Sequence, residues 1–430
     1  MNWSVIIPVV TIIVLLMLNA PVWVALFGGM LPYFFFLGDG LPTQILIQRL
    51  VATTENASYL AIPFFVTAGA IMNHAGLSAR LMDFAEALVG HLSGGLAHVN
   101  VLLSVLMGGC SGSAAADAAM ECKILVPEME KRGYDRDFSA AVTVASSLIT
   151  PIIPPGMGLI LYAFSANVSV GRMFAAGYLP GILCMVFFIV LVDRISKKRG
   201  YKPSRQRMAA PKEILRLGVH ALWALLMPLG IIMALRFGYF TATEAGAIAC
   251  VYSLFIGVFV YHEFKKEHII PVIKESVLGT ATVMVIMCAA NCLSYFLSYE
   301  NIPRAMTNLI VDAGLGRFGF LIIVNIFILI LGMFVSNGMI PILATLLAPI
   351  AASLGIDPIQ FGIIVVFNVT LGNMTPPFGL VLYQVAGLTD LSVPKLAKAC
   401  MPFIVAMLLV LLIITFCEPL AVLLPNLIYG

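Results

Sequence analysis

Charged residues are scarce in this chain: Asp, Glu, Lys and Arg make up 10% of its 430 residues, while 61% are hydrophobic. Such a composition cannot coat the surface of a water-soluble globule of this size. The mean hydropathy of +1.04 and the helix-length apolar runs indicate a polytopic membrane protein, and the short alternating segments of an outer-membrane barrel are missing. We therefore expect an all-α fold.

Sequence motifs of catalysis and metal binding are missing too. The chain has no Gly-x-Ser-x-Gly elbow, no P-loop and no HExxH helix, because HEFKKEH at 262–268 has the wrong spacing. The eight cysteines form no CxxC pair and lie mostly in apolar runs, which disfavours a disulfide framework or a zinc site. The basic residues cluster in loops, so the net charge of +3 bears on topology and gives no sign of nucleic-acid binding. We expect neither catalysis nor a cofactor.

One stretch, residues 104–160, is apolar enough for a membrane interior but repeatedly interrupts its own helix. A spanning helix needs about 20 apolar residues. Backbone that leaves the helix at membrane depth exposes N–H and C=O groups, which cost several kcal/mol each unless protein, water or an ion satisfies them. Such breaks predict a binding site. The interrupting residues are Gly108, Gly109, Gly112, Pro151, Pro154 and Pro155.

Residues 332–380 repeat this pattern. The polar tips, 111–113 and 336–338, correspond at an offset of 225 residues. Two unrelated kinked helices would not be expected to share the identical residues named at the end of this paragraph. Paired Gly/Pro-broken segments in two halves are a signature of secondary transporters, whose substrate and ions lie at the repeat interface, and such repeats are commonly inverted. An offset of 222 aligns Leu125 with Leu347, Pro127 with Pro349, Gly133 with Gly355, Asp135 with Asp357, and Pro154-Pro155 with Pro376-Pro377.

The rest of the chain supplies spans and loops. Residues 1–38 read as one bent helix or two short ones, 39–58 as an interfacial segment, and the charged stretch 121–137 as a membrane-surface segment. The linker 193–216 holds nine of the 24 Lys and Arg residues, so we expect it in the cytoplasm. We expect half-helices at 158–165 and 379–387, and helices at 59–73, 81–95, 174–192, 219–236, 243–261, 276–298, 318–330 and 399–424.

Small polar residues surround both breaks. Half-helix N-termini offer N–H groups to anions, and freed carbonyl groups coordinate Na⁺. Small hydroxyls also let helices pack closely; we favour that interpretation for Ser104 and Ser165, and a functional one for the tips and breaks. The tip and break residues are Ser111, Gly112, Ser113, Ser146, Ser147 and Thr150 in the first half, and Ser336, Asn337, Gly338, Asn368, Asn373 and Thr375 in the second.

Two acids stand apart from the loops. Asp117 lies in an alanine-rich helix, where a buried carboxylate is costly unless it is paired or coordinating. It could bind a cation, carry a proton or stabilise a helix turn at the water interface, and a purely structural role stays open. Glu244 resembles the acid of a helical first turn, with Thr241 or Thr243 as the cap.

Over essentially its whole length the chain resembles the large membrane subunit of TRAP (tripartite ATP-independent periplasmic) transporters, within the ion-transporter superfamily. The resemblance implies a Na⁺-driven elevator transporter of the bacterial inner membrane, with two inverted repeats that each contain a re-entrant hairpin and a broken helix. It also implies two partners, a small four-helix membrane subunit and a periplasmic protein that captures the organic-acid substrate. The most specific motifs are SGSAAADAA, PEMEKRGYDRDFSAAVTVASS, TPIIPP, FTATEAGA, LGIDPIQFGII and TPPFGL.

The resemblance also implies roles by position. At least two Na⁺ per cycle are expected, because one Na⁺ with a monoanion moves no net charge and leaves only the gradient term, about tenfold accumulation. The implied substrate-binding residues are Ser111, Ser146, Ser147, Asn337, Asn373 and Thr375. The implied Na⁺-binding residues, at the two tips and breaks, are Gly109, Ser111, Gly112, Ser113, Thr150, Pro151, Ser336, Gly338, Gly372, Thr375 and Pro376.

The expected parts follow from the same resemblance. They are N-terminal scaffold helices at 1–95, a first transport-domain repeat at 96–192, a cytoplasmic basic linker at 193–217, second-half scaffold or arm helices at 218–315, and a second transport-domain repeat with the C-terminal helix at 316–430.

Two positions depart from the family pattern. Family members commonly carry an acid where this chain has Ser336, and a serine where it has Gly156 after the two prolines. Both lie in the expected site, so a C4-dicarboxylate and sialic acid or another sugar acid are equally allowed. A stand-alone carboxylate transporter without a binding protein is the close alternative; a passive channel and a membrane-embedded enzyme are more distant ones.

Overall fold

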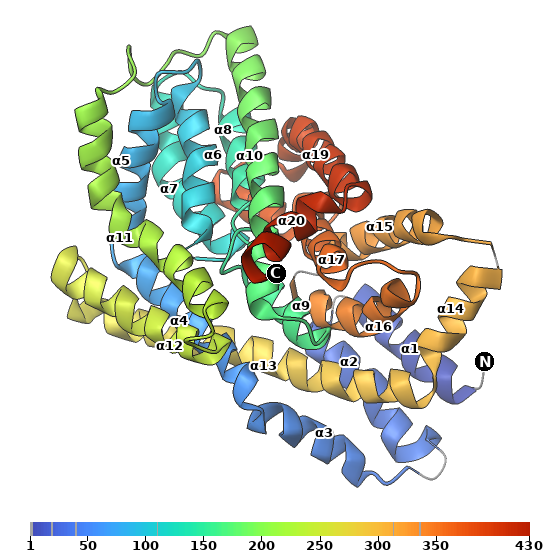
Figure 1. The fold of residues 1–430 in the computed structure, drawn as a ribbon. Helices are drawn as coiled ribbons and strands as arrows, with labels where there is room; N and C mark the ends of the chain where they lie inside the picture. The colour runs from blue at the N-terminus through green and yellow to red at the C-terminus, as the bar shows by residue number, and fades with distance from the viewer. Residues whose placement is uncertain (1–2, 19, 39–40, 110, 313, 335–336) are drawn as a thin grey trace.

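A computed structural model describes residues 3–18, 20–38, 41–109, 111–312, 314–334 and 337–430. Within these ranges the chain forms helices and loops and no strand, which confirms the all-α prediction (Figure 1). Six helices in the described part are long and apolar enough to cross a membrane. The bent pair Ala57–His74 and Leu77–Val89, whose two segments meet at 69°, is a seventh candidate.

Two runs of five helices follow one another in the same order. The first run is α6 (Gly95–Gly108), α7 (Ala114–Lys131), α8 (Arg136–Ser147), α9 (Met157–Ser165) and α10 (Val170–Arg199). The second is α15 (Arg317–Phe334), α16 (Ile340–Ser353, after the turn η5 at Asn337–Met339), α17 (Pro358–Gly372), α18 (Leu380–Leu388) and α19 (Val393–Phe416). In each run two helices joined by a polar tip precede a third helix, a proline-containing break and a short half-helix. The half-helices α9 and α18 are those predicted; the inversion of one run relative to the other stays a prediction.

The remaining helices precede, separate and follow these runs. Among them α4 packs against α12 and α13, α11 against α5, and α13 against α2 and α3. They are α1 (Trp3–Met17), α2 (Val22–Pro32), η1 (Tyr33–Leu37), α3 (Gln44–Glu55), η2 (Ala57–Leu60), α4 (Ala61–His74), α5 (Leu77–Val89), α11 (Pro211–Arg236), α12 (Ala242–Phe255), η3 (Ile256–Val260), η4 (Lys266–His268), α13 (Ile269–Tyr299), α14 (Ile302–Asp312) and α20 (Pro419–Tyr429).

Side-chain caps fix where several helices begin. The hydroxyl of Ser113 accepts a backbone N–H at 3.4 Å at the start of α7. The carboxylate of Asp357 accepts two backbone N–H groups, at 2.7 and 3.1 Å, at the start of α17. Thr241 and Glu244 form a capping box at the start of α12, which confirms the role predicted for Glu244.

Several predicted boundaries were wrong. Helix α10 continues to Arg199, so the basic linker begins as helix; Lys197, Lys198 and Arg199 interact favourably with the C-terminal end of the helix dipole, and Gly200 ends the helix at φ +73°. The segment predicted at 81–95 is α5, which begins at Leu77 and ends at Val89.

The end of the chain also differs from the prediction. The span expected at 399–424 is two helices, because α19 ends at Phe416 and α20 restarts at Pro419, a residue suited to the first helical position. Helix α14 was not predicted. Of the two options for residues 1–38, the structure has two separate helices, α1 and α2.

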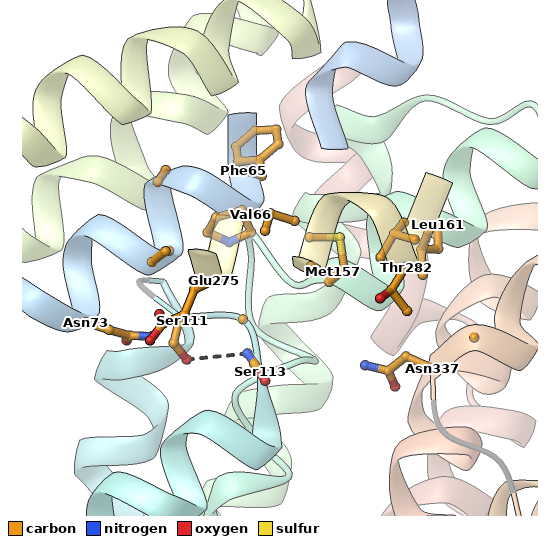
Figure 2. A pocket seen from close by; sticks show the side chains of 18 of the residues that line it. Phe65, Val66, Asn73, Ser111, Ser113, Met157, Leu161, Glu275, Thr282 and Asn337 are labelled. Carbon is orange, nitrogen blue, oxygen red and sulfur yellow. Dashed lines mark hydrogen bonds between the residues drawn. The ribbon is translucent and has the colours of Figure 1, made fainter. Parts of the chain in front are cut away.

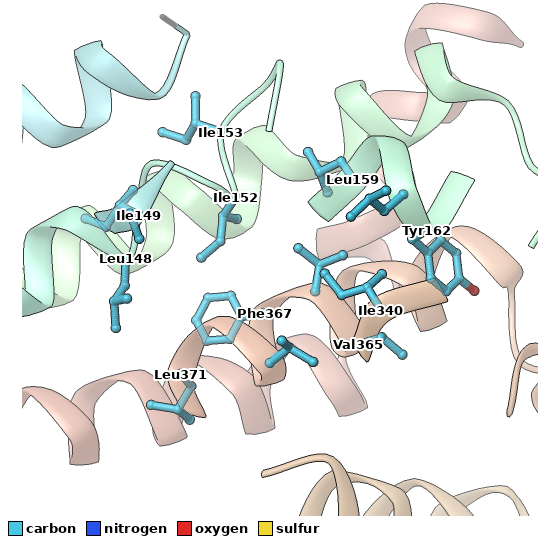
Figure 3. Close-up of a cluster of buried hydrophobic side chains, with 14 of the residues drawn as sticks. Leu148, Ile149, Ile152, Ile153, Leu159, Tyr162, Ile340, Val365, Phe367 and Leu371 are labelled. Carbon is cyan, nitrogen blue, oxygen red and sulfur yellow. The ribbon is translucent and has the colours of Figure 1, made fainter. Parts of the chain in front are cut away.

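The two runs share one buried apolar core. Figure 3 shows Leu148, Ile149 and Ile152 of the first break opposite Phe367 and Leu371 of α17, and all five side chains are at most 1% exposed. Across the same core α8 packs against α19, α7 against α18, and α9 against α16 and α17. Protein interiors are close-packed, so this core holds the non-helical break in place.

Candidate functional site

The first polar tip joins α6 to α7 and lies against the first helix break. Gly112 has φ +60°, and a Cβ at this position would lie 2.9 Å from the carbonyl oxygen of Pro155. A Cβ on Gly156 would clash with the carbonyl oxygen of Pro151. Glycine at 112 lets the tip backbone touch the break, and glycine at 156 lets the break fold back on itself.

The carboxylate of Asp117 connects this tip to the break. Ser111 Oγ donates to Oδ1 at 2.5 Å, and Thr150 Oγ1 donates to Oδ2 at 2.5 Å. Asp117 is 1% exposed, which excludes the predicted alternative of a helix-turn stabiliser at the water interface. Carboxylate and hydroxyl oxygens are the ligands that hard cations prefer, so the chemistry fits a cation here.

Glu121 lies one turn further along α7 and is fully buried. Its burial inside the protein sets it apart from the exposed charges of the stretch 121–137; that this stretch lies at a membrane surface stays a prediction. The stretch begins inside α7, and a spacing of four returns Glu121 to the helix face of Asp117. Ser104 Oγ donates to Glu121 Oε1 at 2.6 Å, and Ser146 Oγ lies 3.3 Å from Oε2.

Three asparagine side-chain oxygens near the second tip and break have no hydrogen-bond donor in the described part of the chain. They are Oδ1 of Asn337 in η5, of Asn368 in α17 and of Asn373 after it. Asn368 is fully buried and Asn373 is 4% exposed. A buried acceptor without a donor costs about 1–3 kcal/mol, and a cation is one partner that satisfies such an oxygen.

A cavity of about 360 Å³ separates the two tips. In Figure 2, Ser111 and Ser113 lie on one side of it and Asn337 on the other. Glu275 is the single charged side chain in the described lining. An anionic ligand would therefore meet a like charge at Glu275 and no Arg or Lys, so that N–H groups of the tip helices and bound cations would have to offset its charge. The volume is in the range of small-molecule sites.

This cavity reaches the end of α13 that the charge pattern places in the cytoplasm. Glu275 follows Lys274, and its Oε1 lies 3.2 Å from His74 Nε2 of α4. Lys265 and Lys266 precede α13 on the same side, where the positive-inside rule puts basic loops. The first tip and the Glu275 end of α13 thus line the same cavity.

A second cavity, of about 490 Å³, adjoins the first at α13 and the second tip. Both cavities are lined by Thr282, Ile286 and Gly338. Asn373 lines the second one, so the two breaks border one connected hollow region.

The structure brings some of the predicted residues to these cavities and not others. Ser336 lies outside the described residues. Substrate and ion roles stay predictions for the whole set. Ser111, Gly112, Ser113, Asn337 and Gly338 line the first cavity, and Asn373 lines the second with Gly338; Gly109, Ser146, Ser147, Thr150, Pro151 and Gly372 are buried and line neither, and Thr375 and Pro376 are half-buried outside both.

Sequence reasoning missed the polar residues that neighbouring helices bring to the site. Asn73 comes from α4, and Glu275 and Thr282 come from α13; no local pattern marks them. Glu121 and Asp117 carried a usable signal, because acids four residues apart share one face of a helix.

Comparison with known proteins decides the family. The family model described as "Tripartite ATP-independent periplasmic transporter, DctM component" matches residues 9–420. The chain belongs to this family. It is 33% identical over 398 residues to the sialic acid TRAP transporter large permease protein SiaM of Vibrio cholerae, covering 92% of this chain and 93% of that protein. It is 36% identical over 402 residues to the C4-dicarboxylate TRAP transporter large permease protein DctM of Pseudomonas aeruginosa, covering 93% of each.

The fold of this TRAP large permease is also similar to that of the YdaH transporter of Alcanivorax borkumensis. The TM-score is 0.63 at 14% identity, covering 96% of this chain and 100% of that chain; this likeness concerns the fold alone. The resemblance inferred from the motifs is confirmed, and the TRAP permease is a multi-pass protein of the bacterial inner membrane.

Proposed function

We propose that this TRAP large permease is the translocating subunit of a Na⁺-coupled importer that moves small organic acids by an elevator mechanism. The observation that carries the proposal is the arrangement of two polar tips, one from each run, across a single cavity, with Ser111 on one side and Asn337 on the other. Family membership supports transport as the activity. A passive channel would not need the buried oxygen groups behind both tips.

Na⁺ is the coupling ion that the side-chain chemistry supports. The residues around the first tip offer hydroxyl and carboxylate oxygens, from Ser111, Asp117 and Thr150. Those around the second offer amide oxygens, from Asn337 and Asn373, for which the described residues supply no donor. Hard cations take oxygen ligands, and irregular backbone at both breaks adds carbonyl groups.

At least two Na⁺ per cycle make uphill uptake of a monoanion effective. Two Na⁺ with one monoanion carry one net charge inwards, which contributes about 2.3 kcal/mol per 100 mV. Each tenfold Na⁺ gradient adds about 1.4 kcal/mol per ion. The sum, on the order of 5 kcal/mol, sustains accumulation of several thousandfold.

The substrate class that fits is a small organic acid. Its carboxylate would lie against the N-termini of α7 and η5–α16, because the described lining offers no cationic side chain. The relatives are named for sialic acid and for C4-dicarboxylates, which share the carboxylate. We propose this shared group as the recognised one.

The proposed partners are a small four-helix membrane subunit and a periplasmic binding protein that delivers the acid. The outer faces of α11, α12 and α13 carry exposed apolar side chains, including Leu229, Val251 and Ile270. Faces of this kind meet lipid or another membrane chain. In an elevator the contacts between α4 and α9 and between α13 and α16 would be exchanged as the tips move.

Uptake into proteoliposomes tests the proposal. The chain is reconstituted with a small TRAP membrane subunit and a periplasmic binding protein, and uptake of radiolabelled sialic acid and succinate is measured with an inward Na⁺ gradient or with K⁺ in its place. Ser111→Ala and Asn337→Ala are compared with Ser165→Ala, a serine predicted to serve packing.

We expect uptake that requires Na⁺ and the binding protein, that weakens in both tip variants and that persists in Ser165→Ala. Uptake indifferent to Na⁺ would overturn the coupling and favour a channel. Na⁺-dependent uptake without the binding protein would favour a stand-alone carboxylate transporter.

A further inference from the structure

Glu121 occupies the interior of the first run and has no part in the uptake scheme above. It lies on α7, four residues after Asp117, and its side chain is fully buried. Among the described residues, no Lys, Arg or His forms an ion pair with its carboxylate, and the charged group that acts on it is Asp117 of the same helix. A carboxylate buried without a cation is costly unless it is neutral.

The hydrogen bonds around Glu121 leave one of its oxygens without a donor of its own. Oε1 accepts from Ser104 Oγ at 2.6 Å. Ser146 Oγ lies 3.3 Å from Oε2, but only 2.7 Å from Asn100 Oδ1. A hydroxyl has one proton, and the shorter contact, to Asn100, takes it.

The remaining hydrogen bonds of this network also donate away from Glu121. Asn100 Nδ2 donates to Thr143 Oγ1 at 2.8 Å, and Thr143 Oγ1 donates to Ser139 O at 3.1 Å. The Thr143 hydroxyl and one N–H of the Asn100 amide then have an acceptor. The one group still missing is a proton between Glu121 Oε2 and Ser146 Oγ.

We infer that Glu121 is a proton-binding site, which in this conformation carries a proton on Oε2 and donates it to Ser146 Oγ. The ligand is the proton itself. Protonation makes the buried side chain neutral and gives each polar group of the network a partner.

The surroundings of Glu121 favour the neutral form from every side. Its own helix brings Asp117 and Cys122, and a second negative charge one turn from an ionised Asp117 would repel it. The polar groups that α6 and α8 bring to its hydrogen-bond network are hydroxyls and an amide, those of Ser104, Asn100, Ser146 and Thr143. Helix α18 packs on α7 with Gln384, whose Nε2 donates to a backbone carbonyl of α7 at 3.0 Å.

The second run shows that the fold does not require an acid at this position. At the offset of 222 residues, Glu121 corresponds to Leu343 of α16, which is 1% exposed. Ser146 corresponds to Asn368, which belongs to a different polar group with Asn325. The first run therefore carries a titratable group where its partner run packs an apolar side chain.

A proton at this site bears on the transport cycle through Asp117. Asp117 accepts from Ser111, which lines the first cavity, and Glu121 lies one helical turn beyond Asp117 on α7. Two binding equilibria this close are linked, and the linkage acts in both directions. The inference stands whether or not Na⁺ is the coupling ion.

Infrared spectroscopy tests the proton directly. We would compare the full-length chain, purified in detergent at neutral pH, with Glu121→Gln, and use the solvent-exposed Glu267→Gln as the matched control. The wild type and the control should show a protonated-carboxyl C=O band that shifts in D₂O. Glu121→Gln should lack it.

A pH series of melting temperatures gives a second readout. A folded chain that holds a proton released on unfolding loses stability as the pH rises, by up to a tenfold change in the unfolding equilibrium per pH unit. From about pH 5, where an unfolded Glu ionises, the melting temperature of the wild type should fall relative to Glu121→Gln, and Glu267→Gln should follow the wild type.

The outcome that overturns the inference is equally clear. A wild type without the band, together with a Glu121→Gln variant that melts in parallel with it at every pH, means that Glu121 is ionised. In that case the Asn100 amide is turned and Ser146 donates to the carboxylate. If Glu121→Gln does not fold, Glu121→Leu, which copies Leu343, supplies the same comparison.

Discussion

Thr150 Oγ1 donates to Asp117 Oδ2 at 2.5 Å, and this bond ties the first helix break to the helix that follows the first tip. The same hydroxyl lies 3.1 Å from Ser104 O on α6. One threonine thus touches both helices that flank the tip. Any movement of the tip relative to the break has to change these contacts. A substitution at Thr150 is therefore expected to affect both stability and transport.

Replacing Thr150 separates its hydroxyl from its shape. Thr150→Val keeps the side-chain volume but leaves Asp117 Oδ2 without a donor in a site that is 1% exposed, at a cost of about 1–3 kcal/mol. We expect a lower melting temperature and a Na⁺ half-saturation for uptake raised roughly tenfold, which corresponds to about 1.4 kcal/mol. Thr150→Ser retains the hydroxyl and should stay close to the wild type. If Thr150→Val and Thr150→Ser behave alike, the hydrogen bond to Asp117 contributes neither to stability nor to Na⁺ binding.

Gly372 tests the packing of the second break. It closes α17 where that helix crosses α15, and a Cβ on Gly372 would clash with the backbone of Gly332. Overpacking of this kind typically costs 1–3 kcal/mol, so Gly372→Ala should melt at a clearly lower temperature than the wild type. Gly387→Ala is the matched control, because its Cβ meets nothing within 4 Å. A stable Gly372→Ala would mean that α15 and α17 can separate at no cost.

Asp135 provides a pH-dependent contribution to stability in the loop before α8. Its Oδ2 accepts from Tyr201 Oη at 2.6 Å and from Arg199 Nη1 at 2.7 Å, and the Tyr201 hydroxyl, followed by Arg199, holds the pKa of the carboxyl below its usual value. A lowered pKa stabilises the fold above the unfolded value, near 3.9, and this stabilisation is lost as the pH falls through the folded value.

We therefore expect Asp135→Asn to melt below the wild type at pH 6 and to converge with it as the pH approaches 3. The Asp135 side chain is 59% exposed, so solvent screening keeps the difference within about 1 kcal/mol. Asp390→Asn, at a side chain that is 86% exposed, is the control. If the difference in melting temperature between wild type and Asp135→Asn grows as the pH falls, the predicted direction of the pH dependence is wrong.

The sequence predicted the breaks better than their surroundings, for a physical reason. Glycine and proline act locally, so Gly112 and the paired prolines mark non-helical backbone wherever the chain packs. The half-helices α9 and α18 follow from those breaks. The burial of Glu121 depends on which face of α7 packs against α6 and α8. That face could not be predicted from the sequence, because most charged residues of the same stretch are exposed. The cavity residues from α4 and α13 depend on contacts between helices far apart in the sequence, such as that of His74 with Glu275, 201 residues apart.

Asn373 offers the sharpest test of the second ion site. Its backbone carbonyl accepts two N–H groups from the start of α18, at 3.1 and 3.3 Å, so the backbone stays anchored whatever the side chain is. Its side-chain Oδ1 has no donor in the described part of the chain, and the residue lines the second cavity. If this oxygen coordinates Na⁺, Asn373→Ala removes a ligand, whereas Asn373→Asp keeps an oxygen and adds a negative charge.

The two variants should therefore move in opposite directions. In proteoliposomes, Asn373→Ala should raise the Na⁺ concentration for half-maximal uptake roughly tenfold, about 1.4 kcal/mol of lost ion binding, and reduce the steepness of the Na⁺ dependence. Asn373→Asp should leave the half-saturation unchanged or lower it, because the added charge attracts the cation. If both variants weaken substrate affinity and leave the Na⁺ dependence intact, Asn373 contacts the organic acid and the second ion lies elsewhere.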